Sequence, residues 1–105
     1  MKNTLLNGQI RSIIFKEAGT WYAVALELNI VESGNDPREV MFLLDEAIRG
    51  YIKSTRKAKL SDAVLNQESD PEYEKLWNQI QTRKQPVNSP LKVYSSASFM
   101  LPSFA

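Results

Sequence analysis

Apolar residues form three runs, separated by short polar links, along the first third of the chain. Residues 10–15 are rich in β-branched and aromatic side chains, and a short polar link containing a glycine separates them from residues 21–28. A third, shorter apolar run at residues 30–33 ends at Gly34. β-branched and aromatic segments joined by short glycine-containing links are typical of neighbouring antiparallel strands. The pattern therefore predicts three strands connected as a meander.

The strand predicted over residues 21–28 carries apolar side chains on both faces. They alternate between Tyr22, Val24, Leu26 and Leu28 on one face and Trp21, Ala23 and Ala25 on the other. Successive side chains of a strand point to opposite sides of the sheet. We therefore expect neither face of this strand to be fully exposed to water.

A long helix is predicted to follow, beginning at Asp36 and Pro37. Asp36 can accept hydrogen bonds from free backbone N–H groups, Pro37 suits the first helical position, and Glu39 stands where a capping box requires an acid. Apolar residues then recur at helical spacing as far as Ile52, with acids in the first half and bases at the end, an order that suits the helix dipole. Phe42 points away from the apolar stripe, so we expect another surface to cover it.

The second half of the chain is predicted to add a helix and a strand. Residues 61–67 suit a short helix, and a longer helix follows from Asp70–Pro71 to about Arg83, with apolar residues at positions i, i+3, i+4 and i+7. Residues 93–101 alternate as a strand does. The predicted fold is α+β: a three-stranded antiparallel β-meander, a long amphipathic helix, then a second C-terminal helix and a terminal strand.

Length favours one domain over residues 1–105, in which residues 9–57 form the β-β-β-α core and residues 58–105 an extension. Residues 1–8 are polar and are expected to be loose. No apolar run approaches the roughly 20 residues that cross a membrane. The start of the chain shows no secretory signal, so we expect a cytoplasmic protein.

Composition narrows the possible functions further. The chain has no cysteine and no histidine, and its net charge is +1. These absences exclude disulfides, thiolate nucleophiles, cysteine-based metal sites and histidine as a general base or metal ligand. A nearly neutral protein has no long-range attraction to a phosphate backbone. We therefore expect neither a cofactor nor global nucleic-acid affinity.

Three strands, a Gly-Asn-Asp turn and a capped helix occur together in Trp21–Leu28, Val31–Glu39 and Val40–Ile52. This combination resembles the HicB family, the antitoxin half of a bacterial toxin–antitoxin pair, over about residues 10–56. The resemblance implies a partial ribonuclease H-like fold, assembly as dimers or tetramers, and sequestration of a small RNA-cleaving toxin. Many HicB proteins add a helix-turn-helix or ribbon-helix-helix segment, but nothing after Lys57 matches either, so DNA binding is not expected.

Catalysis of the ribonuclease H type needs clustered carboxylates that hold Mg²⁺. The first strand offers no carboxylate, and helix capping explains the pair Asp36 and Glu39. Glu27, at a strand end where the family often has glutamate, either bonds the local backbone or solvent or contacts a partner. We therefore expect no catalytic residue and no metal site, and we expect that the chain is not an enzyme.

Aromatic and basic residues suggest a weaker alternative, nucleic-acid binding. Bases could stack on Trp21, Tyr22 and Tyr94 while Arg11 and Lys16 contact phosphate. Aromatic residues in strands, however, belong more often to a core or an interface. The basic residues near the end of the long helix are explained by its dipole.

One helix covers only one face of a three-stranded sheet, so the apolar side chains on the other face remain uncovered. This uncovered apolar surface predicts association instead. Ala23 and Ala25 are small enough for another backbone or helix to lie close. The expected partner or oligomer interface comprises Trp21, Ala23, Ala25, Phe42, Tyr94, Phe99 and Leu101. Alternatively, the C-terminal half folds back over its own core, and the sequence leaves open whether the last strand pairs within the chain or with another subunit.

The sequence thus predicts a non-catalytic protein–protein interaction module. Its expected partners are further copies of itself, as a dimer or tetramer, and a small basic toxin, as for a HicB-like antitoxin or an orphan relative. A stand-alone oligomeric scaffold or ligand-binding protein is the alternative, and a nucleic-acid-binding protein is the third.

Overall fold

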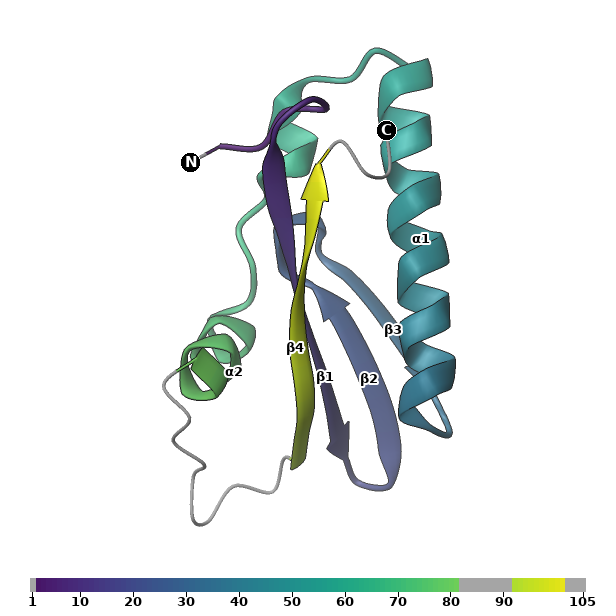
Figure 1. Ribbon diagram of the computed structural model, residues 1–105, viewed down its shortest axis with the longest axis vertical. Coiled ribbons are helices and arrows are strands. Elements are labelled where there is room, and N and C mark those ends of the chain that lie inside the picture. Colours follow the sequence, from purple (N-terminus) through teal and green to yellow (C-terminus); the bar gives the residue numbers. More distant parts are fainter. Residues whose placement is uncertain (1, 82–91, 102–105) are drawn as a thin grey trace.

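The computed structural model describes residues 2–81 and 92–101 (Figure 1). Four antiparallel strands form one sheet in the order β3-β2-β1-β4. Their bounds are Gly8–Glu17 for β1, Thr20–Ala25 for β2, Ile30–Gly34 for β3 and Lys92–Leu101 for β4. The helices are α1, Pro37–Lys57, and α2, Pro71–Gln81, and two short 3-10 turns are η1, Leu26–Leu28, and η2, Asp62–Leu65. The described chain is an α+β structure.

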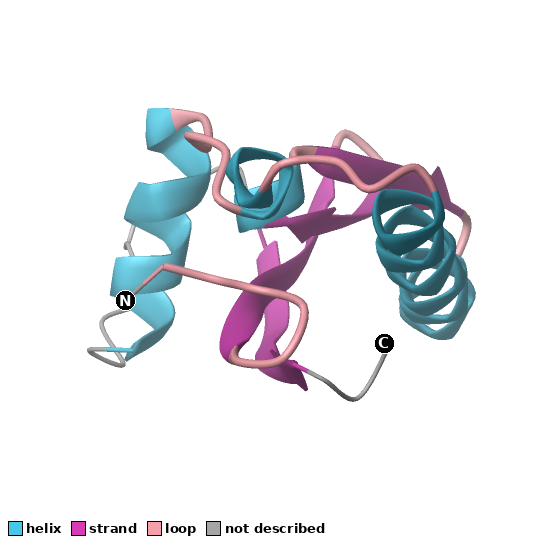
Figure 2. Cartoon of the chain, turned by 90° about the horizontal axis from the view of Figure 1, so that it is seen from above, coloured by secondary structure: helices cyan, strands magenta, loops and turns pink. Residues whose placement is uncertain are grey.

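The sheet lies between the two helices, which cover opposite faces (Figure 2). Ile10 and Ile14 of β1 pack in the same cluster as the apolar stripe of α1, whereas Ile13 and Phe15 pack with α2. All four side chains are buried. Helix α1 lies mainly over β2 and β3, and α2 lies over β1 and β4. Both faces of β1 are therefore used as core, which explains why its sequence is apolar at consecutive positions.

Helix α1 begins where local chemistry favours a start. The Asp36 carboxylate accepts a hydrogen bond from the Glu39 N–H at 2.9 Å, and Pro37 occupies the first turn. The residues buried on the face toward the sheet are Val40, Leu44, Ile48, Ile52 and Thr55. Because these positions recur at helical spacing, one continuous stripe faces the sheet and the opposite side of α1 stays in solvent.

The end of α1 is a left-handed turn at Lys59. The Lys59 N–H donates to the Arg56 carbonyl at 3.2 Å and the Leu60 N–H to the Thr55 carbonyl at 3.0 Å, the pair of bonds that closes a helix C-terminus. The φ angle of Lys59 is +54°, where a Cβ atom is strained. We expect Lys59→Gly to raise the free energy of unfolding by about 1 kcal/mol in urea denaturation.

The matched control for Lys59→Gly is Ala58→Gly, because Ala58 has an ordinary φ of −86°. There the same change should lower the free energy of unfolding by up to about 1 kcal/mol. Equal effects of the two substitutions would contradict the left-handed turn.

The second strand is shorter than the sequence predicts. β2 ends at Ala25, and the η1 turn carries the chain through Leu26 and Leu28 to Asn29, whose φ is +53°. A 3-10 turn does not keep the two-residue alternation of a strand. Leu26 therefore packs on the α2 side and Leu28 on the α1 side. The prediction that they share a strand face is wrong.

Hydrogen bonds of Asn3 fix the N-terminal segment to the rest of the fold, contrary to the expectation that residues 1–8 are loose. Asn3 is only 3% exposed, and its side-chain amide donates to the Leu65 carbonyl at 2.9 Å. Its side-chain oxygen accepts from the Gln9 N–H at 2.7 Å, and its own backbone bonds the Asn66 side chain. Asn3 thus forms buried and partly buried hydrogen bonds, three of them to residues more than 60 positions away, which sequence polarity alone does not reveal.

The meander is not the complete sheet, because β4 pairs with β1 from Gly8 opposite Leu101 to Lys16 opposite Lys92. β1 thereby becomes an internal strand, and the C-terminal strand pairs within the chain. The three-stranded sheet predicted for the core is corrected to four strands. The second apolar face of β1 explains the difference: α2 packs on that face, and β4 pairs along the edge of β1 that β2 leaves free.

Candidate interaction surface

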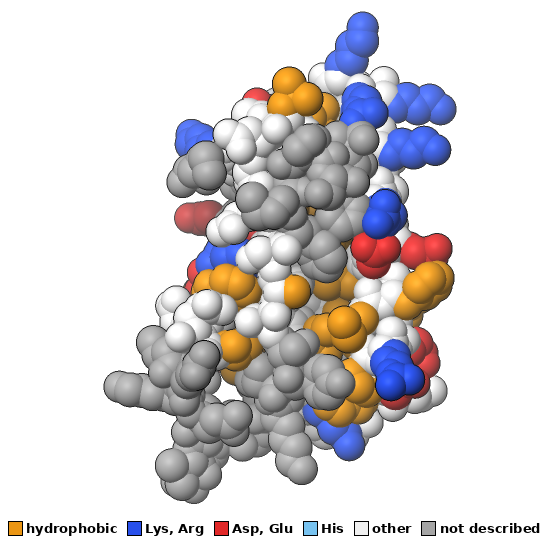
Figure 3. Space-filling view, in the orientation of Figure 1, with side chains coloured by type: hydrophobic (Ala, Val, Ile, Leu, Met, Phe, Trp, Pro, Cys, Tyr) orange, Lys and Arg blue, Asp and Glu red, His pale blue; other side chains and the backbone are white. Residues whose placement is uncertain are grey.

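Several large apolar side chains remain exposed on the described surface: Leu6, Val31, Met41, Phe42 and Leu60. Phe42 and Met41 are adjacent on the first half of α1, and Phe42 is 61% exposed. Figure 3 shows hydrophobic side chains among acidic and basic ones on this side of the molecule. An aromatic ring held in solvent by a regular helix is a candidate contact for another protein.

Acidic residues outnumber basic ones among the nearest neighbours of Phe42 on the surface of α1. Residues three and four positions away on a helix are its surface neighbours. For Phe42 these include three acids, Glu39, Asp45 and Glu46, and one base, Arg38. We call Met41, Phe42 and these three acids the α1 patch. Its chemistry favours a partner surface that combines an apolar recess with basic residues.

Two of the predicted interface residues are not at the surface. Ala23 and Ala25 are completely buried in the cluster beneath α1. Their small side chains do let another element lie close, but that element is α1 of the same chain. The prediction that Ala23 and Ala25 contact a partner is therefore corrected: α1 already fills the space that a partner would need.

The predicted stacking surface is divided between the two sides of the sheet. Trp21 is half-buried on the α1 side, and the Lys16 Nζ lies 5.8 Å from its ring centroid. Tyr22 packs on the α2 side, where its ring stacks on Phe15 with centroids 5.4 Å apart. Trp21 and Tyr22 therefore do not form one platform for bases.

β4 is an edge strand that pairs, among the described strands, with β1 alone. Ile14 stands opposite Ser95 and Phe15 opposite Val93, so Tyr94 is an extra residue, as in a β-bulge. Regular pairing then runs from Ser95 to Leu101. The side chains of Tyr94, Phe99 and Leu101 lie outside the described part of the chain, and so do the interface predictions made for them.

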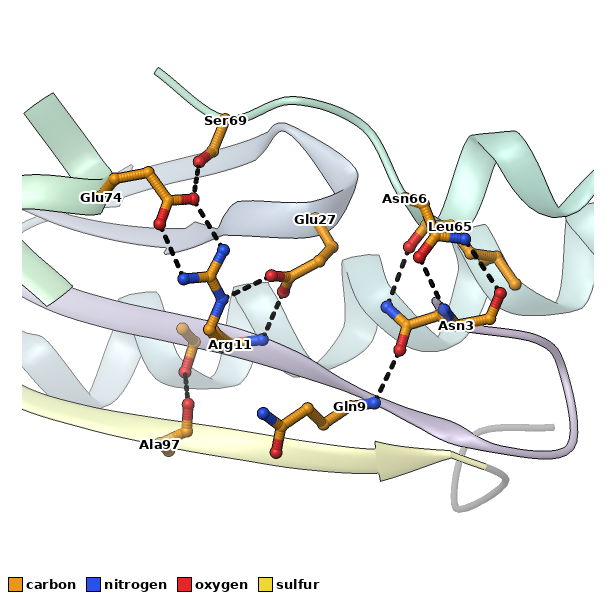
Figure 4. Close-up of polar contacts among 10 residues, drawn as sticks. Asn3, Gln9, Arg11, Glu27, Leu65, Asn66, Ser69, Glu74 and Ala97 are labelled. Carbon is orange, nitrogen blue, oxygen red and sulfur yellow. Dashed lines mark hydrogen bonds and ion pairs between the residues drawn. The ribbon is translucent and has the colours of Figure 1, made fainter. Parts of the chain in front are cut away.

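Arg11 is the centre of a polar cluster within the described part of the chain (Figure 4). Its Nη1 and Nη2 donate to the two carboxylate oxygens of Glu74, each at 2.7 Å, and its backbone N–H donates to Glu27 at 2.7 Å. Its Nε also donates to Glu27, the Ser69 hydroxyl donates to Glu74, and the guanidinium carbon lies 5.6 Å from the Trp77 ring centroid. Arg11 therefore joins β1, η1 and α2, and its guanidinium is occupied by carboxylates rather than open to phosphate.

This cluster also explains Glu27, which bonds locally to the backbone and side chain of Arg11. The sequence allowed either a bond to the local backbone or solvent or a contact with a partner, and a bond within the chain describes this geometry. Sequence reasoning missed Glu74 and the structural role of Arg11. The one available signal was a charged residue within the otherwise apolar strand over residues 10–15.

The Arg11 cluster makes stability depend on pH in the acid range. Hydrogen bonds from Arg11, then from Ser69, together with the positive charge of Arg11, lower the pKa of the Glu74 carboxyl below its ordinary value of 4.5, against the opposing effect of burial. A carboxyl whose pKa is lowered by folding contributes stability above its ordinary pKa and loses it as pH falls through the folded pKa. We expect the free energy of unfolding to fall with pH below about 4.5.

The measurement is urea denaturation from pH 7 to pH 3 for the wild type and Glu74→Gln. The amide cannot titrate, so the variant should be less stable at pH 7 and show a shallower acid decline. Parallel pH curves would mean that Glu74 does not contribute to the acid response.

Three broader observations bear on function. Within residues 2–81 and 92–101, no group of three or more acidic, histidine or cysteine residues is placed to hold a metal ion. No helix in the described part of the chain is both long and apolar enough to cross a membrane. Comparison with family models, curated proteins and solved structures finds no match. The candidate surfaces are therefore interpreted from their own residues.

Proposed function

We propose that this chain is a HicB-like protein that binds another protein through the α1 patch and performs no chemistry of its own. The observation that supports this best is Phe42, which is 61% exposed on a well-packed helix within one turn of three acids. Exposed aromatic side chains on rigid elements are common anchors of protein interfaces. The order β1-β2-β3-α1 is compatible with the residue pattern that resembles HicB.

The partner that suits this surface is a small basic protein, such as an RNA-cleaving toxin. A protein that binds RNA exposes basic residues for phosphate. Glu39 and Glu46 of the α1 patch would pair with such residues, whereas Asp45 already pairs with Arg49 at 2.9 Å. Phe42 would enter an apolar recess between those basic residues. Inhibition would then be steric, because the bound chain occupies the surface that RNA needs, and it would require neither a metal nor a proton transfer.

The proposal requires a small basic protein encoded by a reading frame adjacent to that of this chain, and its test is calorimetric titration of the purified chain with that protein. An anchor residue typically contributes at least 2 kcal/mol, so Phe42→Ala should weaken binding by roughly thirtyfold or more. Because Phe42 lies outside the core clusters, the melting temperature should stay close to that of the wild type.

Leu60→Ala is the matched control, because Leu60 is also an exposed apolar residue but lies beyond the end of α1. It should leave the affinity unchanged. The proposal fails if no adjacent reading frame encodes a small basic protein, if the wild type does not bind that protein, or if both variants bind it as the wild type does.

A further inference from the structure

We infer that the outer edge of β4 is a self-association surface. Two copies of the chain would pair their β4 strands antiparallel across a two-fold axis. Each copy contributes a four-stranded sheet, so the pair would form one continuous eight-stranded sheet. This assembly does not depend on the α1 patch, because it uses a different element of the fold.

The backbone of β4 supplies the first reason. An edge strand presents a row of N–H and C=O groups that need partners. The Ala97 carbonyl accepts a hydrogen bond from the Ser12 hydroxyl of β1, so the backbone polar groups of Ala97 point toward β1. These groups alternate in direction along an antiparallel strand, so those of Ser96 and Ser98 point to the outer edge.

The outer edge of β4 also lacks the usual protection against pairing. Natural edge strands are kept apart by short length, charged residues, proline or bulges. The bulge at Tyr94 disrupts only the first part of β4, and the regular run from Ser95 to Leu101 contains no charged residue, proline or glycine. The opposite edge, β3, is five residues long and carries Glu32. The two edges therefore differ, and β4 is the one suited to pairing.

The sequence of this run indicates that the partner is a second copy. If the two-fold axis passes through Ser98, that residue stands opposite its own copy, and the outward backbone groups of the two strands meet. The remaining register positions then oppose a small residue to a large one: Ala97 to Phe99, Ser96 to Met100, and Ser95 to Leu101. Like charges never oppose each other, because the run has none. Such self-complementarity is what an isologous interface requires.

The described residues at the proposed two-fold axis are accessible to a second copy. Ala97 and Ser98 are exposed, and Ser98 stands opposite Arg11 in the β1–β4 register. Neither α1 nor α2 covers these two positions. A second β4 strand can therefore approach without displacing an element of the described fold.

Site-specific cross-linking tests the pairing, because the chain contains no cysteine. Residues opposite each other in a hydrogen-bonded antiparallel pair have Cα atoms about 5.5 Å apart, within the range that a disulfide bridges. Ser98→Cys should cross-link to a dimer under mild oxidation, seen on a non-reducing gel. Ser33→Cys, exposed on the opposite edge strand β3, should stay monomeric on that gel.

Sedimentation of the uncross-linked protein provides the second readout. The wild type should sediment at twice the chain mass of 12.0 kDa. Ser98→Lys places like charges opposite each other at the axis and should weaken the dimer roughly tenfold. Because Ser98 also stands opposite Arg11 of the same chain, the melting temperatures of the variant and the wild type are compared at a concentration where both are monomeric, to separate a loss of fold stability from a loss of pairing. Ser33→Lys should leave the dimer intact. A monomeric wild type, or equal cross-linking of Ser98→Cys and Ser33→Cys, overturns the inference.

Partner binding through the α1 patch and self-association through β4 can each be refuted without the other. Ser98→Lys should still bind the basic partner, and Phe42→Ala should still dimerise. Loss of dimerisation in Phe42→Ala would place self-association on α1 and contradict the assignment to β4. Retained dimerisation with no partner binding by the wild type would refute the proposed function and leave the β4 interface standing.

Discussion

Replacing Gly8 with alanine is expected to lower the free energy of unfolding by about 3 kcal/mol. Gly8 has a φ of +135°, which side chains with a Cβ rarely adopt. An added Cβ would lie 2.0 Å from the Asn3 Oδ1 and 2.9 Å from the Asn3 Cα. Because one of these atoms is backbone, a side-chain rotation cannot relieve the overlap. The N-terminal segment would have to move, and its hydrogen bonds to Gln9 and Leu65 would be lost.

Urea denaturation of Gly8→Ala and Gly50→Ala measures this effect against a matched control. Gly50 is exposed in the middle of α1, and nothing lies within 4 Å of an added Cβ. There alanine should raise the free energy of unfolding by about 0.5–1 kcal/mol, because it restricts the unfolded chain and favours the helix. If Gly8→Ala also stabilises, or costs less than about 1 kcal/mol, the packing of Asn3 against β1 is wrong.

The second large effect is expected for Arg11→Met, which should lower the free energy of unfolding by about 2–3 kcal/mol. The variant keeps an apolar stem of similar length but leaves Glu27, whose side chain is only 16% exposed, without its positive partner. Glu74 loses both of its bonds to the guanidinium. Since these bonds join α2 to β1, the fluorescence of the neighbouring Trp77 should also change.

Arg49→Met is the control, because Arg49 also pairs with an acid, Asp45, but is 59% exposed on α1. Exposed pairs of this kind contribute about 0.5 kcal/mol or less. Urea denaturation of both variants gives the comparison. Equal losses would show that the Arg11 cluster does not hold α2 against the sheet.

Features fixed by neighbouring residues could be predicted from the sequence. The start of α1 depends on Asp36 and Pro37, which act on the next turn of the chain. The positions of the strands and helices followed from apolar periodicity in the same way. The end of β2 could not be predicted, because η1 is held partly by the Gln67 N–H, which donates to the Glu27 carbonyl at 2.9 Å from forty residues further on.

The candidate interaction surfaces show the same difference between features set by neighbouring residues and features set by contacts distant in sequence. Phe42 was predicted to point away from the apolar stripe because helical geometry alone sets its direction, and the described residues do not form the surface that was expected to cover it. Ala23 and Ala25 were assigned to an interface because the sequence does not reveal which element covers them. The role of Arg11 was missed because Glu74, its principal partner, is 63 positions away. Local signals thus gave the elements, and distant contacts decided which faces remain free.

The central claim, that the chain acts by binding a protein partner, is tested most directly by its native mass after purification from its own cells. The account predicts a complex that contains the 12.0 kDa chain, as two copies joined through β4, together with a small basic protein. The Phe42→Ala variant should be recovered without the basic protein. Recovery of the wild-type chain alone, as a monomer or as a homodimer, would contradict the claim.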